Sequence, residues 1–349
     1  MRTGVLDIGS NSAHLLVVDL MAGLPPLPVG AVKCPTRLAE AIGPDGTIEE
    51  PAVGRLVAAV RQAVEEAREL EVDELVVFAT SAVRDAANAT EILGRIERAC
   101  GVRPGFLSGE AEARLTFHAV RAWYGWSAGG ILLADIGGGS LELAYGRAAL
   151  GGAEPQVAMS LPLGAGRLTR RFLPDDPPRR KDLRRLRRRV EAKLERRLPV
   201  LREAVAEVPD RPLLAVATSR TFTQLAVLAG APRASAGPYA RRTLDRADLR
   251  AQIPRLARRP AERRARMRGV SRPRARQIVA GAIVAERVMA ALDLTRVEIC
   301  PWALREGVAL HRLLALTDPE HADRTVLTDL LQPMPDAGGQ RRRHLAVLG

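Results

Sequence analysis

Two short stretches of the chain place an aspartate, glycine and serine in the same order. They are DIGSNS, from Asp7 to Ser12, and DIGGGS, from Asp135 to Ser140. Each lies between two apolar runs, which predicts a turn at the end of a buried strand. Glycines in such a turn let the backbone approach a ligand and leave several N–H groups facing one space, where phosphate oxygens bind. The aspartate at each strand end and the nearby serine hydroxyl suit hydrated Mg²⁺, which prefers oxygen ligands.

The similarity of the two stretches extends into the rest of the chain. A shift of 128 positions aligns Asp7 with Asp135, and a shift of 138 aligns ATSAVR, residues 79–84, with ATSRTF, residues 217–222. Each ATS stretch follows a predicted strand and opens a predicted helix. The nearly constant offset predicts a duplicated α/β domain with a site between the two copies. Chance similarity of two strand–turn units is the alternative.

Hydrophobic periodicity predicts the helices that accompany these units. We expect helices within residues 48–72, 108–123, 177–205, 276–294 and 298–316, and a helical region between the second glycine turn and about residue 208. The expected first domain covers residues 1–126 and is completed by a helix at about 303–317. The expected second domain covers residues 127–302, and residues 318–349 are expected to form a flexible tail.

Length, cysteine spacing and hydropathy narrow the class of protein. The 349 residues suit two domains of about 150 residues each. The three cysteines lie far apart, so we expect buried free thiols in a cytoplasmic protein. Neither a signal peptide nor a membrane span is expected.

The charge of the chain is unevenly distributed. Residues 1–126 carry 12 basic and 17 acidic side chains, whereas the remainder carries 41 basic and 23 acidic side chains. The plain interpretation of each arginine run is a solvated helix face. The functional interpretation is a surface that attracts a polyanion.

Taken in order, the motifs DIGSNS, ATSAVR, SGEAEAR, DIGGGSLEL, ATSRTF and ALREG resemble the exopolyphosphatase/guanosine pentaphosphate phosphohydrolase (Ppx/GppA) family. The resemblance covers residues 3–315 and is strongest to short, two-domain exopolyphosphatases of actinobacterial type. It implies the ribonuclease H-like fold of the actin, sugar-kinase and heat-shock-chaperone ATPase (ASKHA) superfamily, with two actin-like domains and an interdomain cleft.

The resemblance also implies roles for individual residues. Asp7 and Asp135 would help to hold Mg²⁺, while Glu112 and Glu142 would be catalytic, Glu112 by activating the attacking water. The implied phosphate-binding residues are Ser10, Asn11, Ser12, Arg84, Gly137, Gly138, Gly139 and Ser140. The candidate substrate-binding residues from the two ATS tripeptides are Ser81, Thr218, Ser219 and Arg220.

Two positions depart from the family pattern, and two assignments have a plainer alternative. Ala111 stands where many members carry an acidic residue. Arg220 stands where they carry glycine, which places a cation that could meet phosphate. Arg84 could instead form a salt bridge with Asp85, and Glu112 could simply complement a helix N-terminus.

These features predict a Mg²⁺-dependent hydrolase that releases terminal orthophosphate from inorganic polyphosphate. Guanosine pentaphosphate is the rival substrate. A non-catalytic sensor that binds phosphate or nucleotide is the alternative from a different class, and an ATP-dependent kinase is a third. Glu112, a carboxylate suited to activating water, argues against the kinase. Nucleic acid is not an expected partner, because few aromatic side chains accompany the arginines; a homodimer is left open.

Overall fold

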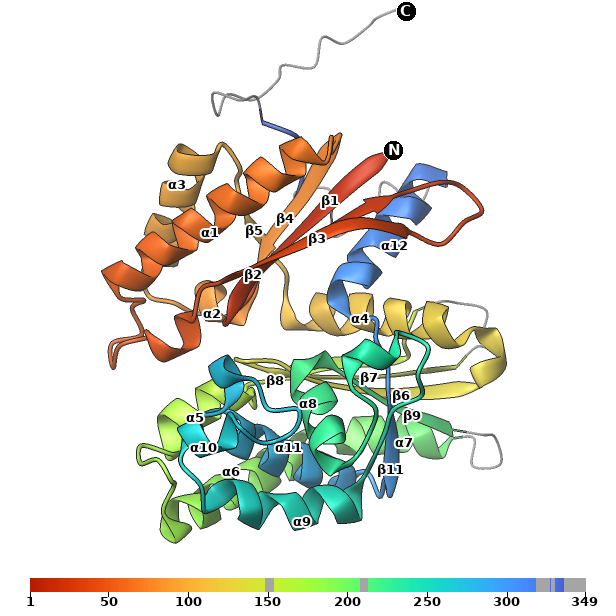
Figure 1. Ribbon diagram of the computed structural model, residues 1–349. Helices are drawn as coiled ribbons and strands as arrows, with labels where there is room; N and C mark the ends of the chain where they lie inside the picture. Colours follow the sequence, from red (N-terminus) through yellow and green to blue (C-terminus); the bar gives the residue numbers. More distant parts are fainter. Residues whose placement is uncertain (148–153, 208–212, 318–326, 328–329, 336–349) are drawn as a thin grey trace, which may run out of the picture. The chain divides into compact units, whose positions relative to one another are not determined.

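The computed structural model describes residues 1–147, 154–207, 213–317, 327 and 330–335. The chain divides into two compact units, one formed by Met1–Ser108 with Val308–Gly349 and the other by Gly109–Gly307. Each unit contains a six-stranded mixed sheet with helices packed on it, as Figure 1 shows. The fold is therefore α/β, as the sequence predicts.

The first unit is built on a sheet with the order β12-β4-β1-β2-β3, and β5 also pairs with β4. β1 is antiparallel to β2 and parallel to β4. Helix α1 packs against β2 and β3. The strands are β1 (Arg2–Ile8), β2 (Ser12–Asp19), β3 (Leu27–Pro35), β4 (Glu74–Ala79), β5 (Gly105–Phe106) and β12 (Leu331–Pro333). The helices are η1 (Leu38–Glu40), α1 (Glu50–Glu69), α2 (Ser81–Arg84), α3 (Ala89–Cys100) and α12 (Leu304–Thr317), whose first turn belongs to the second unit.

The second unit is built on a sheet with the order β10-β11-β9-β6-β7-β8. Its strands are β6 (Gly130–Ile136), β7 (Leu141–Arg147), β8 (Val157–Leu161), β9 (Leu213–Thr218), β10 (Thr243–Asp245) and β11 (Arg296–Ile299). Its helices are α4 (Gly109–Tyr124), η2 (Trp126–Ala128), α5 (Ala165–Phe172), α6 (Arg180–Arg197), α7 (Pro199–Ala206), α8 (Ser219–Ala229), η4 (Ala234–Ala236), α9 (Arg246–Ala257), α10 (Ala261–Arg264), η5 (Arg272–Arg274) and α11 (Ile278–Ala291).

The two sheets share one topology. In each, an antiparallel three-stranded meander (β1-β2-β3 or β6-β7-β8) is joined through its first strand to two parallel strands, β4 and β5 or β9 and β11. This is the duplication that the glycine turns and the ATS tripeptides predict. The third strand of each meander, β3 or β8, was not predicted, and the region after the second turn is therefore not wholly helical. Both are edge strands, and their half-exposed residues dilute the alternation of apolar and polar side chains.

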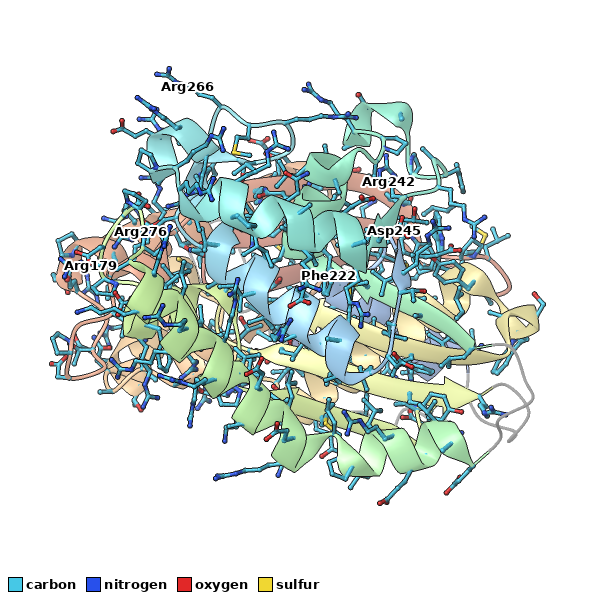
Figure 2. The ribbon with its side chains drawn as sticks, turned by 90° about the horizontal axis from the view of Figure 1, so that it is seen from below. Arg179, Phe222, Arg242, Asp245, Arg266 and Arg276 are labelled. Carbon is cyan, nitrogen blue, oxygen red and sulfur yellow. The ribbon has the colours of Figure 1, made fainter. Side chains whose placement is uncertain are left out.

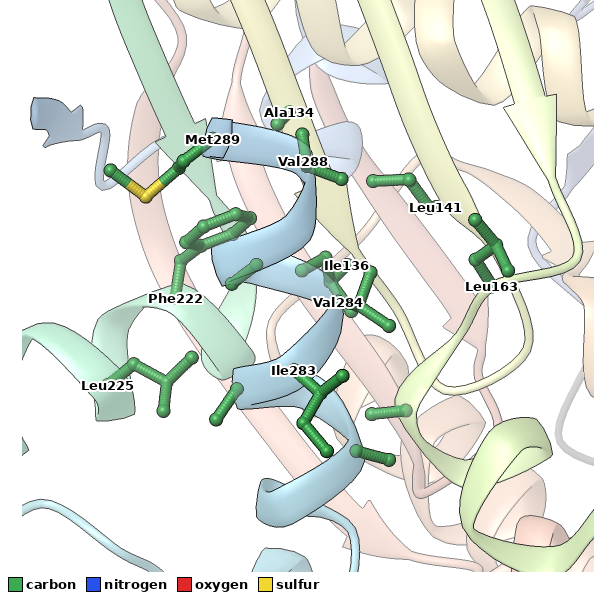
Figure 3. Packing of buried hydrophobic residues seen from close by; sticks show 14 of the residues in the cluster. Ala134, Ile136, Leu141, Leu163, Phe222, Leu225, Ile283, Val284, Val288 and Met289 are labelled. Carbon is green, nitrogen blue, oxygen red and sulfur yellow. The ribbon is translucent and has the colours of Figure 1, made fainter. Parts of the chain in front are cut away.

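The second sheet is buried on both faces. Ile131 and Leu133 of β6 pack on the side of Phe117 and Val120 from α4, whereas the alternate residues Leu132, Ala134 and Ile136 belong to the cluster on the other face. Figure 3 shows this second cluster, in which Phe222 of α8 and Val284 of α11 lie beside the strands. Helix α11 is flanked by α5, α6, α8 and α9. The alternation explains why the strand reads as a continuous apolar run.

The structure also bears on the predictions for the cysteines, the C-terminal tail and membrane spans. Cys34, Cys100 and Cys300 are free and buried, as predicted, and burial raises the pKa of the Cys300 thiol to about 12. Most of the expected tail at 318–349 lies outside the described residues, but Leu331–Pro333 forms β12, which pairs with β4. No described helix combines the length and apolar character that a membrane span requires.

Candidate active site

The second glycine turn, Gly137–Ser140, joins β6 to β7, and its carbonyl groups accept hydrogen bonds from residues of α5. The N–H of Gly137 donates to the carbonyl of Ser140 at 3.0 Å, which closes the turn. The carbonyls of Gly137, Gly138 and Gly139 accept hydrogen bonds from Ala165 N (3.0 Å), Arg167 N (2.9 Å) and Arg167 Nε (2.8 Å) respectively. In a trans peptide the C=O and the following N–H point in opposite directions. The N–H groups of residues 138–140 therefore face away from α5, which is the orientation that a phosphate-binding nest would require.

The first turn, Gly9–Asn11, is closed by the equivalent hydrogen bond, from Gly9 N to Ser12 O at 3.0 Å. Its carbonyls are also occupied, because Ser10 O accepts from Ala39 N at 3.0 Å and Asn11 O accepts from Thr36 N at 3.0 Å. The two turns therefore present backbone N–H groups in the same way. Each follows the strand that carries the predicted metal ligand, Asp7 on β1 or Asp135 on β6.

Gly164 supports the second turn. A Cβ at this position would lie 2.3 Å from the carbonyl carbon of Gly139 and 2.3 Å from Ser140 N, both backbone atoms. Only glycine allows the segment before α5 to approach the turn this closely. The identity of residue 164 therefore fixes the position of the second glycine turn.

We expect Gly164→Ala to displace the turn and to weaken the binding of orthophosphate about tenfold or more. The free energy of unfolding should fall by about 1–3 kcal/mol, as in other overpacked sites. Isothermal titration calorimetry with orthophosphate and a thermal melt measure both effects. Gly54→Ala is the control, since a Cβ on that residue of α1 meets nothing within 4 Å. Unchanged phosphate binding by Gly164→Ala would show that the turn is not the anion site.

Three carboxylates of the second unit lie close together beside this turn. Asp135 and Glu142 are directly paired across β6 and β7, and such pairs have Cβ atoms about 4.5–5.5 Å apart. α4 packs on β7 and β8 and brings Glu112, from its first turn, to the same place. Glu112 and Glu142 are 7% and 5% exposed. The two predicted catalytic residues and one predicted metal ligand are thus brought together.

The pKa of Glu142 is shifted by its surroundings. Burial raises its pKa well above the ordinary value, and the neighbouring charges of Glu112 and Asp135 raise it further. Hydrogen bonds from Ser140 and Ser160 act in the opposite direction; the Ser160 hydroxyl donates to Glu142 Oε1 at 2.8 Å. Like charges held this close favour either a bound proton or a bound cation.

The donor set fits Mg²⁺ rather than a metal held by protein ligands alone. Within the described ranges, no three His, Cys, Asp or Glu residues are arranged as a metal cage. Mg²⁺ does not need one, because it usually keeps several waters and binds one or two carboxylates together with substrate phosphates. Carboxylate oxygens near a phosphate nest match that requirement.

The predicted residues of the first unit lie at one end of its sheet. Ile8 of β1 is in register with Ala79 of the parallel strand β4, so Asp7 and the first turn lie beside Ser81 at the start of α2. Arg84 ends α2 and is bound within the unit. Its Nη1 donates to the carbonyl of Leu107 at 2.5 Å, and its Nε pairs with Asp85 at 3.3 Å. The plainer alternative for Arg84, a pair with Asp85, is thus present.

The residues of the second ATS tripeptide follow β9, where Thr218 lies beside Asp135 of β6, and they line a cavity. The Thr218 hydroxyl donates to the carbonyl of Trp302 at 2.9 Å, and the carbonyl of Cys300 lies 3.3 Å from the same oxygen, which holds the segment after β11. Ser219 has a φ of 85°, which is uncommon for a residue other than glycine. A cavity of about 360 Å³ is lined by Thr218, Ser219, Arg220 and the chain around Cys300, and its lining does not include the three carboxylates.

Sequence reasoning missed two arginines that border the second turn. Arg167 binds two of its carbonyls, as described above. Arg274 approaches Thr221 Oγ1 at 3.5 Å, and that hydroxyl donates to Ile136 O at 2.9 Å. Burial and the charge of Arg220 lower the pKa of Arg274 to about 10, although Asp135 opposes the shift. Nothing in the sequence separates Arg274 from the many arginines around it.

Comparison with known proteins tests the resemblance of the whole chain to a family. The model of the Ppx/GppA phosphatase family matches residues 16–316. Exopolyphosphatase 1 of Mycobacterium tuberculosis is 50% identical over 94% of this chain and 92% of its own length, and that of Mycobacterium leprae is 47% identical over 94% of each.

Solved structures give the same result. An exopolyphosphatase from Cytophaga hutchinsonii matches with a TM-score of 0.77 at 25% identity, over 90% of this chain and 98% of that one. The Aquifex aeolicus member of the Ppx/GppA family matches with a TM-score of 0.70, also at 25% identity and with the same coverage. The chain therefore belongs to the Ppx/GppA phosphatase family.

Proposed function

We propose that this chain is an exopolyphosphatase that releases terminal orthophosphate from inorganic polyphosphate with the help of Mg²⁺. The observation that carries the proposal is the cluster of Glu112, Asp135 and Glu142 beside the second glycine turn. The 50% identity to proteins named exopolyphosphatase, over most of both chains, supports the same substrate class.

Different residues have different roles in the proposed hydrolysis. The N–H groups of each glycine turn, with the serine hydroxyl beside it, bind phosphate oxygens. Glu112, at the start of α4, orients the attacking water and accepts its proton. Asp135 and Asp7 are the residues that would hold Mg²⁺, which offsets negative charge on the transferring phosphoryl group when it is bound.

The expected activity is orthophosphate release from tripolyphosphate and from long polyphosphate in the presence of Mg²⁺, with little release from ATP. Guanosine pentaphosphate is assayed beside them as the rival substrate, and preference for it would replace polyphosphate in the proposal. If no substrate releases orthophosphate while Mg²⁺-dependent binding persists, the chain is a sensor rather than an enzyme.

Removal of divalent metal should abolish the activity, because the phosphate charges are then left opposite uncompensated carboxylates. We expect orthophosphate release to fall below about one hundredth of its value in excess chelator and to return when Mg²⁺ is added. Ca²⁺ is the matched control, since it is larger and accepts more irregular coordination. Full activity in chelator would contradict the role given to Asp135 and Asp7.

A further inference from the structure

A basic surface begins at the edge of the second glycine turn, on α5. Arg167 binds the turn directly, through N to Gly138 O (2.9 Å) and Nε to Gly139 O (2.8 Å). Arg170 lies one helical turn further along α5. Burial lowers the pKa of Arg170, and the nearby charge of Arg167 lowers it further. Two guanidinium groups are therefore held close together immediately beside the phosphate nest.

The surface continues from α5 to α6 across one aromatic ring. Arg171 of α5 and Arg185 of α6 both lie over Phe172, with their guanidinium carbons 5.7 and 5.4 Å from the ring centroid. Phe172 is itself buried, at 6% exposure, whereas both arginines are exposed. Cation–π contacts of this kind fix the guanidinium groups while leaving their N–H groups accessible.

The outer side of α6 is almost entirely cationic in its N-terminal half. Leu186, Val190 and Leu194 are buried and Leu183 packs against the same core, so the opposite side of the helix faces solvent. The exposed basic residues between 180 and 189 are Arg180, Lys181, Arg184, Arg185, Arg188 and Arg189. Figure 2 shows many side chains extending outward from α6, with Arg179 labelled near its N-terminal end.

Three acidic residues near this surface are paired with arginines, and a fourth, Asp182, lies in the first turn of α6 among its basic residues. Glu191 pairs with Arg287 at 2.8 Å, and Asp175 pairs with Arg179 at 2.7 Å. Asp176 pairs with Arg264, which is 1% exposed, and also accepts from Ala261 N at 2.7 Å. The three paired carboxylates therefore neutralise little of the charge on Arg184 and Arg188.

We propose that Arg170, Arg171, Arg184, Arg185 and Arg188, the α5/α6 basic face, bind the distal phosphates of an inorganic polyphosphate chain whose end is held at the second glycine turn. The inference rests on the proposed function and adds a subsite to it. A guanidinium group can bind two phosphate oxygens at once. Arg167 and Arg170 on α5 lie beside the turn, and the contacts of Arg171 and Arg185 with Phe172 connect α5 to α6. Polyphosphate carries a charge on every unit and no bases. The face matches this chemistry, since its one aromatic ring, Phe172, is buried rather than open for stacking.

The test is the double variant Arg184→Glu/Arg188→Glu, assayed with polyphosphate of several hundred units and with tripolyphosphate. We expect KM for the long chain to rise about tenfold or more and KM for tripolyphosphate to change less than about twofold. The dependence of the long-chain KM on salt should also become shallower, because fewer phosphates are neutralised. The matched control is Arg196→Glu/Arg197→Glu. It makes the same change of charge at exposed positions in the last turn of the same helix and should leave both KM values within about twofold.

Three results would overturn the proposal. One is an unchanged KM for the long chain in Arg184→Glu/Arg188→Glu. Another is an equal rise of the long-chain KM in the control variant. That would indicate that the positive electrostatic potential of the whole second unit, and not this face, attracts polyphosphate. The third is single-stranded DNA that binds the wild type but not Arg184→Glu/Arg188→Glu, with polyphosphate kinetics unaffected, which would assign the face to nucleic acid.

If the chain is not an exopolyphosphatase, the result differs from the three outcomes above. The wild-type protein then releases no orthophosphate from either chain. The equilibrium dissociation constants of the wild type and Arg184→Glu/Arg188→Glu for the long chain still decide whether the face binds polyphosphate. Thermal melts of both variants confirm that the comparison is made between folded proteins.

Discussion

Glu112→Gln should lower the rate of orthophosphate release from polyphosphate by a factor of about 10²–10⁴, the usual contribution of a general base. The amide has the same shape but cannot accept a proton from water. Because the substitution leaves the backbone N–H groups of the glycine turn in place, the dissociation constant for tripolyphosphate should remain within about threefold. Orthophosphate release and calorimetric binding, measured on the same preparation, separate the two effects.

Glu110→Gln is the matched control for this variant. Glu110 lies two residues earlier on α4, is exposed, and pairs with Arg114 at 2.9 Å. Its replacement removes a charge from the same helix end and should change the rate less than about twofold. If Glu112→Gln retained more than a tenth of the wild-type rate, another group would have to activate the water.

Glu142→Gln should reduce activity by about 10² or more and at the same time make the metal-free protein more stable at pH 8. The pKa of this acid is raised in the folded protein, so the native state holds its proton more tightly than the unfolded chain. As pH rises from the unfolded pKa, about 4.3, through the raised folded pKa, ionisation weakens the fold. Glutamine avoids this loss and keeps an oxygen that can accept from Ser160.

Thermal melts between pH 4.5 and 9 without divalent metal measure the effect. We expect the variant to gain about 0.5–2 kcal/mol at pH 8, and the difference to shrink as pH falls toward 4.5. Added Mg²⁺ should also reduce it, since a cation relieves the same repulsion. Glu195→Gln, at an exposed position of α6, controls for removal of any one acidic group. A variant less stable than the wild type at pH 8 would show that the hydrogen bonds of Glu142 outweigh the repulsion.

The sequence predicted the duplicated part of the fold because that part depends on local patterns. The apolar runs on either side of the two glycine turns predicted β1, β2, β6 and β7, and the runs before the two ATS turns predicted β4 and β9. Residues that act through tertiary contacts were harder to predict. Arg167 supports the second turn through its position on α5, yet it carries no motif. Thr218 belongs to a motif, but its hydroxyl holds the backbone after β11.

The residues of the candidate site were likewise predicted only where a motif contains them. The motifs located Glu112, Asp135 and Glu142, and the pairing of β6 with β7 and the packing of α4 then explain why they meet. Their roles remain predictions that the variants above test. The positive φ of Ser219 and the burial of Arg274 could not be predicted, since both depend on how segments distant in sequence pack together.

The pairing of β12 with β4 affects the order in which the protein can fold during synthesis. β4 pairs with β1 near the start of the chain and, at Glu74–Val76, with β12 at Leu331–Pro333. The second unit is continuous and its whole sequence has been made by Gly307. At about 5–20 residues per second, the ribosome then needs roughly another 1–5 seconds to supply β12. Until then part of β4 has an open edge that other strands can pair with. The unit that is begun second is therefore the first that can fold completely.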